Sequence, residues 1–490
     1  MGFSELVATI SSWIWGMPFV ILCLLTGSYF SFRTGFLQIR YIKDMVRMLF
    51  KGKSSDSGIS SFQSFVLALS GRVGTGNIAG VATAIALGGP GAIFWMWIIA
   101  FFGAGTAYVE ASLGQIYKEK IDGNYRGGPA YYILKGLKMK KYALAFALVT
   151  IIALGVLMPG LQSNAICNAF SNSFGMKEPV TGGIVVALLA LVIFGGVRRI
   201  ARVAEIITPF MAVAYTIIAL IIVAINVQHI PAMFILIVKS AFGFHPAMSG
   251  IIGAAVTMGV KRGIFSNEAG QGTAPHAAAA AEVSHPAKQG FVQAFSVYID
   301  TLLVCSATAF IILITGMYRV YDSDKNVIFD GMALPEGMHE YGPVYTQLGV
   351  DAHFTGFGSP FVAIALFFFA FTTIMSYYFQ AETNVYFLFR SKKASYYAIN
   401  ILRFGMLIVT FFTSINTMVL AWDLADIGVG LMAWFNIIAI LLLQKTALNT
   451  FFDYEKQRKQ GIAEPVFDPR KLSIENADEW DIINKQLNNK

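Results

Sequence analysis

The chain has 490 residues, of which 56% are apolar and only 13% are charged. A water-soluble protein of this size carries about 25% charged residues, so the composition excludes an ordinary soluble protein and indicates one embedded in lipid. The net charge of +8 does not indicate a nucleic-acid partner, because the basic residues lie in short connections between apolar runs rather than in one stripe.

Eleven apolar segments are long enough to cross a hydrocarbon core, which takes about 20 helical residues. They are predicted at 13–32, 62–87, 92–117, 143–171, 180–197, 204–227, 247–281, 289–317, 358–389, 395–416 and 424–446. The first lacks a basic leader and a small-x-small cleavage site, so we expect it to remain as a membrane helix. The sequence therefore predicts an all-α polytopic membrane protein, with a transmembrane domain over 1–449. A polar cytoplasmic tail over 450–490 is expected to be partly helical or disordered.

The distribution of Lys and Arg over the connections predicts the orientation. When the connections are assigned to alternate sides, one side collects 20 basic residues and the other collects 4. We therefore expect a multi-pass protein of the plasma membrane with its N-terminus outside and its C-terminus in the cytoplasm. The longest predicted outer connection, 318–357, is acidic, as an outer loop can be.

The ten segments after the first divide into two sets of five, 62–227 and 247–446, with opposite orientations. The first segment of each set is interrupted at mid-length by glycines and polar residues. Such paired interruptions indicate a transporter binding site near the middle of the bilayer. The halves share no visible sequence identity, so this symmetry is predicted from topology alone.

The first interruption is Ser70–Gly80, with the sequence SGRVGTGNIAG. Unwound backbone at this depth is tolerated where it lines a cavity or is buried in protein. Its free carbonyl oxygens can bind a cation, and the free N–H groups that begin the outer half-helix favour a carboxylate. These features predict a site for a zwitterion and Na⁺. The alternative is close helix packing through small residues.

The second interruption is Lys261–Pro275, with the sequence KRGIFSNEAGQGTAP. Charged side chains within the membrane are costly, so a functional role is the first hypothesis. A cytoplasmic loop is an alternative, but the flanking apolar runs 250–260 and 274–281 are each too short to span. Structural ion pairing that involves Arg262 and Glu268 is expected in either case.

Four strings resemble the alanine or glycine:cation symporter family. They are GTGNIAGVA (74–82), GGPGAIFWMW (88–97), RGGPAYY (126–132) and KRGIFSNEAG (261–270). The resemblance covers about residues 10–446. It implies a LeuT-type fold of two inverted five-helix repeats plus one extra N-terminal helix. It also implies import of a small neutral amino acid by alternating access, with Na⁺ as the coupling ion, no other cofactor and no enzymatic activity.

By this resemblance, substrate contacts come from both interruptions and from two other helices. The residues are Thr75, Gly76, Asn77, Gln162, Gly263, Ile264, Phe265 and Tyr377. The backbone at 75–76 would face the substrate carboxylate beside the Asn77 amide, and the carbonyls at 263–265 would take the ammonium group, with Phe265 as an apolar wall. Gln162 follows Pro-Gly in an apolar helix, and its alternative role is to bond a neighbouring helix.

The Na⁺ site is also implied by the resemblance. The hydroxyls of Thr372 and Thr373 would face the carbonyl oxygens of Ser70 and Val73, and an all-oxygen site suits a hard cation. The alternative for the threonines is a hydrogen bond to the preceding turn of their own helix.

The chain departs from the family pattern where many members have Gly-Trp. Here the residues are Ser376 and Tyr377. Tyrosine in place of tryptophan changes the volume of the pocket and adds a hydroxyl, so glutamine becomes a candidate substrate beside alanine and glycine.

Three further membrane carboxylates, Glu110, Asp300 and Glu382, have two open interpretations. Each could relay a proton or couple an ion, and each could be a structural partner of Arg72 or Arg262. A membrane enzyme is disfavoured because the six histidines are scattered without a catalytic motif. A channel is disfavoured because asymmetric broken helices fit alternating access. The main alternative is a proton-coupled carrier of the same fold; the sequence does not predict the oligomeric state.

Overall fold

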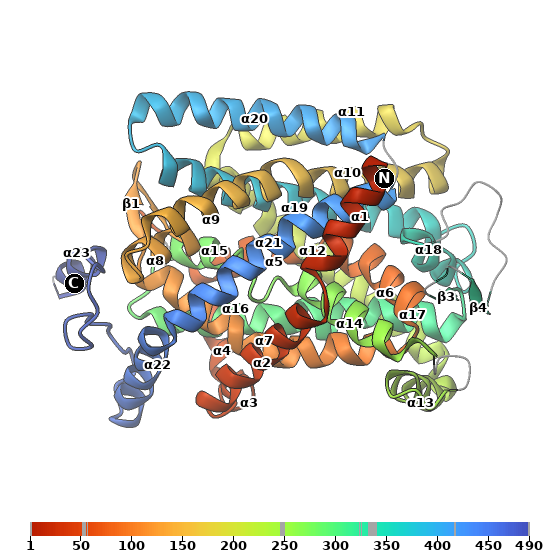
Figure 1. Cartoon of the computed structure of the whole chain (residues 1–490), viewed down its shortest axis with the longest axis horizontal. Coiled ribbons are helices and arrows are strands. Elements are labelled where there is room, and N and C mark those ends of the chain that lie inside the picture. The colour runs from red at the N-terminus through yellow and green to blue at the C-terminus, as the bar shows by residue number, and fades with distance from the viewer. Residues whose placement is uncertain are drawn as a thin grey trace.

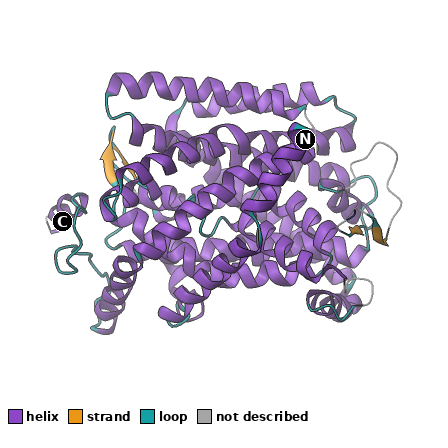
Figure 2. Ribbon diagram, in the orientation of Figure 1, coloured by secondary structure: helices purple, strands orange, loops and turns teal. Residues whose placement is uncertain are grey.

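The computed structural model describes residues 2–50, 55, 57–245, 250–322, 324, 326–331, 341–415 and 418–488. The described chain is almost wholly helical, and two short antiparallel strand pairs lie at opposite ends of the molecule (Figure 2). Long helices run along the horizontal axis of Figure 1 and form most of its body.

Eight helices or continuous helical runs in the described residues are long and apolar enough to cross a membrane. They are α1 with α2 (Phe3–Ile14, Met17–Arg33), α7 (Gly91–Ile116), α9 with η2 and α10 (Lys140–Ile152, Ala153–Leu157, Met158–Phe174), α12 (Gly196–Ile225), α16 with η5 and α17 (Pro286–Val297, Tyr298–Cys305, Ser306–Thr315), α19 (Gly358–Leu388), α20 (Lys392–Ser414) and α21 (Met418–Leu442). A ninth span is bent by 50° between α5 (Ser61–Arg72) and η1 with α6 (Gly76–Gly80, Val81–Gly88). The multi-pass helical architecture is therefore confirmed.

Two of the eleven predicted spans do not reach this length. Helix α11 (Glu178–Ile193) has 16 residues, and α14 (Ile252–Asn267) is separated from α15 (Ala274–Ala280) by a second break. The first span also differs from its prediction, because it begins at Phe3 rather than near residue 13. Pro18, which lacks an N–H group, lies in the first turn of α2 and separates it from α1.

The shorter elements gather at the two ends of the molecule (Figure 1). One end carries β1 (Glu119–Ile121), β2 (Asn124–Arg126), α8 (Pro129–Gly136), α22 (Gln444–Lys459) and α23 (Glu479–Asn488); the other carries β3 (Arg319–Tyr321), β4 (Val327–Asp330) and α18 (Pro343–Asp351). Helices α3 (Leu37–Arg40) and α4 (Ile42–Leu49) follow α2, and η3 (Val227–His229) precedes α13 (Ile230–Ala241). A simple connection was predicted over the residues of α13. That prediction is wrong, since this segment is apolar and forms a 12-residue helix.

The C-terminal tail contains two helices and packs against the end of α7. The Trp480 side chain is fully buried, and its indole N–H donates to the Gln115 carbonyl over 3.0 Å. The Lys118 ammonium lies 5.1 Å from the Trp480 ring and donates to the Ala281 carbonyl over 3.1 Å. Burial lowers the pKa of Lys118 to about 8. The tail therefore covers one end of the helix core.

Helices α7 and α19 position the two broken helices. Helix α7 packs against α14 and α15, while α19 packs against α5 and also contacts α15. In Figure 1, α5 and α15 lie toward the end with β1, whereas α6 and α14 lie toward the end with α18. Both breaks therefore lie between the two ends of the molecule.

Candidate functional site

The first break lies at Val73–Thr75, where the sequence predicted it. Gly74 is required there, because a Cβ atom would collide with the Thr373 hydroxyl and come within 3.0 Å of Gln162 Oε1. Two side chains hold the unwound backbone: the Gly74 N–H donates to Asn77 Oδ1 over 2.8 Å, and the Thr75 N–H donates to Gln162 Oε1 over 3.0 Å. The break is thus a fixed conformation, with its freed donors satisfied.

Four predicted substrate residues meet at this break. Thr75, Gly76, Asn77 and Gln162 are all buried there. The side-chain oxygens of Asn77 and Gln162 accept hydrogen bonds from backbone N–H groups that were predicted to bind a carboxylate. A bound carboxylate would take the place of these acceptors. Gln162 also bonds a neighbouring helix, which was its alternative role.

The predicted cation ligands also lie together. The Thr373 Oγ1 atom is 2.8 Å from the Ser70 carbonyl oxygen, 3.3 Å from that of Val73 and 2.9 Å from that of Phe369. The Thr372 hydroxyl donates to the Phe369 carbonyl of its own helix over 3.0 Å. Hydroxyl and carbonyl oxygens from α5 and α19 thus converge on one small buried volume, and this donor set suits Na⁺.

The second break lies later than predicted. Gly263, Ile264 and Phe265 belong to α14, which continues to Asn267, so the break occupies only the later part of the predicted string Lys261–Pro275, and the prediction that the carbonyls at 263–265 belong to the interruption is wrong. The chain leaves the helix at Glu268, where φ is 55°, and two glycines with positive φ follow, at 270 and 272. Gly263 has another purpose: a Cβ atom there would collide with Ile99 of α7. Glycine is used both where helices pack closely and where a helix unwinds, so a glycine in the sequence does not reveal which of these roles it has.

The carbonyl oxygen of Ile264 already accepts two hydrogen bonds. The Glu268 N–H donates to it over 2.9 Å, and the Gln271 side chain donates over 2.6 Å. The Phe265 ring lies where its predicted role requires, because its Cδ1 atom is 3.3 Å from the position that a Cβ would take on Gly76. Phe265 therefore forms an apolar wall beside the first break.

An ionic and aromatic layer lies next to Phe265. The Phe265 ring packs against Trp422 with centroids 4.9 Å apart, and the Arg262 guanidinium lies 4.2 Å from the Trp422 ring. Arg262 donates to both carboxylate oxygens of Asp426 over 3.0 and 2.8 Å, and Lys261 pairs with the same carboxylate at 2.6 Å. This layer, Lys261, Arg262, Phe265, Trp422 and Asp426, lies beside the first break, since Phe265 and Trp422 reach Gly76 and Gly80.

Sequence reasoning missed Trp422 and Asp426. A signal was present, because Asp426 is an acidic residue inside the predicted apolar segment 424–446, and such a residue calls for a partner. Its partner Arg262 lies 164 positions away in the chain, and no local pattern connects the two residues.

Glu110 stabilises the second break. Its carboxylate accepts hydrogen bonds from the N–H groups of Gly270 and Gly272 over 3.2 and 3.1 Å, and from the Asn436 amide over 2.7 Å. A buried carboxylate with three donors is well compensated. Glu110 therefore has a structural role: its hydrogen bonds come from the second break and Asn436, and the predicted Arg72 acts on it as a nearby charge.

Glu382 pairs with arginines other than the two predicted, whereas Asp300 lies near the predicted Arg72 but takes its hydrogen bonds from other residues. Glu382 pairs with Arg126 at 3.2 Å and Arg403 at 3.7 Å, near the end that carries β2. The Asp300 carboxylate accepts from Asn77 over 2.6 Å and from Thr301 over 2.7 Å, and it also bonds the Ser266 hydroxyl. Asp300 thus links the first break to α14 and η5.

Tyr377 is directed toward the second break. Its side chain is buried, and its hydroxyl interacts with the Glu268 carboxylate. The neighbouring Ser376 hydroxyl donates to the Leu67 carbonyl of α5 over 3.0 Å. The hydroxyl that distinguishes this chain from the family pattern is therefore engaged by a protein group.

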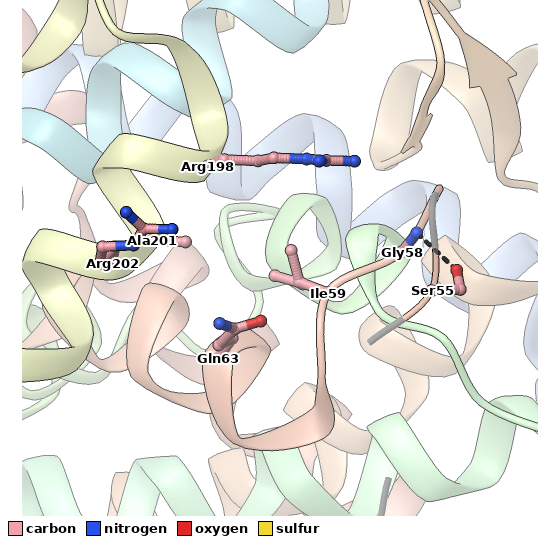
Figure 3. A pocket seen from close by; sticks show the side chains of 7 residues that line it. All are labelled: Ser55, Gly58, Ile59, Gln63, Arg198, Ala201 and Arg202. Carbon is pink, nitrogen blue, oxygen red and sulfur yellow. Dashed lines mark hydrogen bonds between the residues drawn. The ribbon is translucent and has the colours of Figure 1, made fainter. Parts of the chain in front are cut away.

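A basic crevice lies apart from this site (Figure 3). It is formed by Ser55, Gly58, Ile59, Gln63, Arg198, Ala201 and Arg202, and Arg198 extends above Ile59. Gln63 precedes the first break by ten residues, which is about 15 Å of helix. The crevice therefore does not contain the predicted substrate or cation residues.

Comparisons with known proteins agree with the sequence resemblance. The profile of the "Sodium:alanine symporter family" matches residues 1–469. The chain is 55% identical to a candidate sodium/proton-dependent alanine carrier of Bacillus subtilis, over 98% of both chains. It is 49% identical to a sodium/proton-dependent alanine carrier of Bacillus sp. strain PS3, over 89% of this chain and 97% of that one. It is also 44% identical to a candidate sodium/glutamine symporter of Bacillus subtilis, over 94% and 93% of the two chains.

Proposed function

Because this chain belongs to the sodium:alanine symporter family, we propose that it imports alanine together with Na⁺ by alternating access. The family consists of membrane transporters, and the chain is a multi-pass symporter rather than an enzyme. We also propose that its helices form two inverted LeuT-type repeats of five, preceded by one extra helix.

One observation carries this proposal. The first break places N–H groups suited to a carboxylate beside the oxygen atoms of Ser70, Val73 and Thr373, which suit a cation. A zwitterion and Na⁺ bound together would each reduce the cost of burying the other's charge. Binding of the pair would then favour the closed state, and rocking of one helix set against the other would open the opposite side.

The membrane potential would supply part of the work. A cation that moves inward through about 100 mV gains about 2.3 kcal/mol.

The test is alanine uptake by the purified protein in liposomes. Uptake is expected under an inward Na⁺ gradient and is expected to cease when Na⁺ is replaced by choline at constant pH. Unchanged uptake without Na⁺ would reject Na⁺ coupling and leave the proton-coupled carrier as the function. Two relatives are named as dependent on both ions, so the pH must be held fixed.

Alanine is expected to be preferred over glutamine. The Tyr377 hydroxyl, which made glutamine a candidate, is engaged by Glu268, and Phe265 beside the first break is itself buried. Accommodating a longer polar side chain would cost several unpaired hydrogen-bonding groups, so we expect at least about tenfold weaker competition by glutamine. Competition by unlabelled alanine, glycine and glutamine against labelled alanine measures this preference. Equal competition by glutamine would contradict it.

The proposed orientation places the N-terminus outside and the tail in the cytoplasm. The three native cysteines are buried, so introduced cysteines report the topology cleanly. In intact cells, an impermeant maleimide is expected to label Lys177→Cys before α11 but not Lys459→Cys at the end of α22. Both should react after permeabilisation. Labelling of Lys459→Cys in intact cells would reverse the assignment.

A further inference from the structure

A second basic crevice, with a volume of about 500 Å³, lies at the end of the molecule that carries β1. It is bounded by the β1–β2 hairpin, the end of α19 and the start of α20. We call it the α20 crevice, and its charged lining residues are Lys120, Asp122, Arg390, Lys392 and Arg403. The described residues that line it include none of the predicted substrate or cation residues.

Two lysines reach the α20 crevice from different elements. Lys120 belongs to β1, and Lys392 is the first residue of α20. Both are exposed, and neither side chain forms an ion pair with a residue that the structure describes. Their positive charges repel each other and those of the arginines, so an anion among them would be stabilised.

The two arginines of the crevice are held in place by neighbouring groups. Arg390 donates to the Glu119 carboxylate over 2.6 Å. Arg403 donates from Nε to the Tyr378 hydroxyl over 2.8 Å, and its Nη2 atom lies 3.7 Å from the Glu382 carboxylate. Both guanidinium groups are therefore positioned before any ligand binds, which lowers the entropic cost of binding one.

The α20 crevice keeps an excess of three positive charges. Four cations and one carboxylate line it. Three further carboxylates contact these lining residues: Glu119, Glu382 and Glu479. Each of the three also faces a cation outside the lining, and these cations are Lys135, Arg126 and Lys118. The neighbouring charges therefore cancel, and the excess remains.

Helix α20 begins at this crevice. Lys392 is its first residue, and the preceding Ser391 makes no side-chain cap hydrogen bond. The N–H groups of the first turn and the helix dipole therefore also favour an anion here.

The α20 crevice lies at the expected boundary of the bilayer. Helix α20 is long enough to cross a membrane, and only 28% of its most apolar stretch is buried, so most of it faces lipid. It runs along the edge of the molecule in Figure 1. In the proposed orientation this end is cytoplasmic, where anionic lipids give the membrane a negative surface.

The crevice also has an apolar wall, formed by Tyr396 and Ile399. Tyr396 is 64% exposed, and tyrosine is typical of the membrane–water interface. An apolar wall beside four cations suits a phosphate that carries a glycerol backbone and acyl chains better than it suits free phosphate.

We propose that the α20 crevice binds the headgroup of an anionic phospholipid, with the phosphate taken by its lysines and arginines and the glycerol backbone beside Tyr396 and Ile399. This inference goes beyond the proposed function and uses only its proposed orientation. The bound lipid joins the β1–β2 hairpin to the ends of α19 and α20. It therefore stabilises the folded protein.

The test measures the thermal unfolding midpoint of the purified full-length protein in detergent as phosphatidylglycerol is added. Phosphatidylglycerol is expected to raise the midpoint in a saturable way, because a ligand of the folded state stabilises it by mass action. Phosphatidylcholine with the same acyl chains and inorganic phosphate are expected to give much smaller shifts. The first lacks net charge, and the second lacks the glycerol backbone and chains.

The double variant Lys120→Gln, Lys392→Gln identifies the site. Its apparent affinity for phosphatidylglycerol is expected to fall by about tenfold or more, since each lysine at a lipid surface contributes about fivefold. Lys140→Gln with Lys141→Gln is the matched control, because it removes the same charge from two exposed lysines at the start of α9, outside the crevice. The control should stay within about twofold of the wild type. If the double variant does not fold, Lys392→Gln alone should weaken binding by about threefold or more.

Several outcomes would overturn this inference. Equal shifts with phosphatidylglycerol and phosphatidylcholine would show that the headgroup is not recognised, and an equal shift with inorganic phosphate would assign the crevice to a free anion. Equal losses in the double variant and the control would place the lipid elsewhere. The absence of any shift would exclude a lipid ligand that stabilises the fold. None of these measurements requires uptake, so they are independent of the test of alanine and Na⁺ symport.

Discussion

Replacing Asp426 with asparagine is expected to lower alanine uptake by about 100-fold, because it leaves Lys261 and Arg262 buried without a counter-charge. Breaking a buried ion pair by removing one partner costs about 3–5 kcal/mol. Asp426 is fully buried and accepts from both cations, so its loss should disturb the layer that packs beside the first break. Uptake in liposomes and thermal stability in detergent measure the two consequences.

Two companion variants identify the cause of that loss. Asp426→Glu keeps a carboxylate and should retain most of the uptake. Adding Lys261→Met to Asp426→Asn removes one of the two unpaired cations, and it should recover part of the stability if uncompensated charge is the cause. Wild-type uptake by Asp426→Asn alone would show that the layer does not control access to the site.

Replacing Thr373 with valine is expected to raise the Na⁺ concentration needed for half-maximal uptake by at least about tenfold, because a hydrogen bond or ligand to a charged group contributes about 1.5–3 kcal/mol. Valine keeps the shape of threonine but removes the hydroxyl that lies 2.8 Å from Ser70 and 3.3 Å from Val73. The measurement is labelled alanine uptake as a function of Na⁺ at constant pH and ionic strength.

The controls for this second variant use the same chemistry. Thr373→Ser keeps the hydroxyl and should stay within about threefold of the wild type. Thr410→Val makes the same substitution at a buried threonine of α20, outside the site, and should leave the Na⁺ dependence unchanged. If Thr373→Val alters only the maximal rate, the hydroxyl is structural and the cation binds elsewhere.

The predicted spans agree best with the observed helices where a single continuous apolar run defined them. Segments such as 92–117 and 358–389 agree with α7 and α19 within a few residues, because a continuous apolar run needs no partner to be identified. Helix α13 was missed because its apolar run is shorter than a membrane span, and the segment was therefore interpreted as a connection between spans. The tail was predicted in outline, but its packing through Trp480 was not.

The two breaks differ in how well the sequence located them. At the first, Gly74 is needed by the break itself, so the glycine-rich string marked the right residues. At the second, Gly263 serves close packing against Ile99, and the backbone turns only at Glu268. A glycine permits both arrangements, and the neighbouring helix decides between them.

The sequence by itself determined that the chain is a multi-pass membrane protein, located nine of its eleven predicted spans, and marked two segments as interrupted; the binding of a zwitterion and a cation there stays a prediction. Hydropathy, charge bias and glycine spacing are properties of neighbouring residues, so they can be read without a structure. Only the tertiary structure decided the partners: Arg262 with Asp426, Glu110 with the N–H groups of the second break, and Glu268 with Tyr377. The charge of a buried side chain demands compensation, but many distant groups could provide it, and the choice is made when the helices pack.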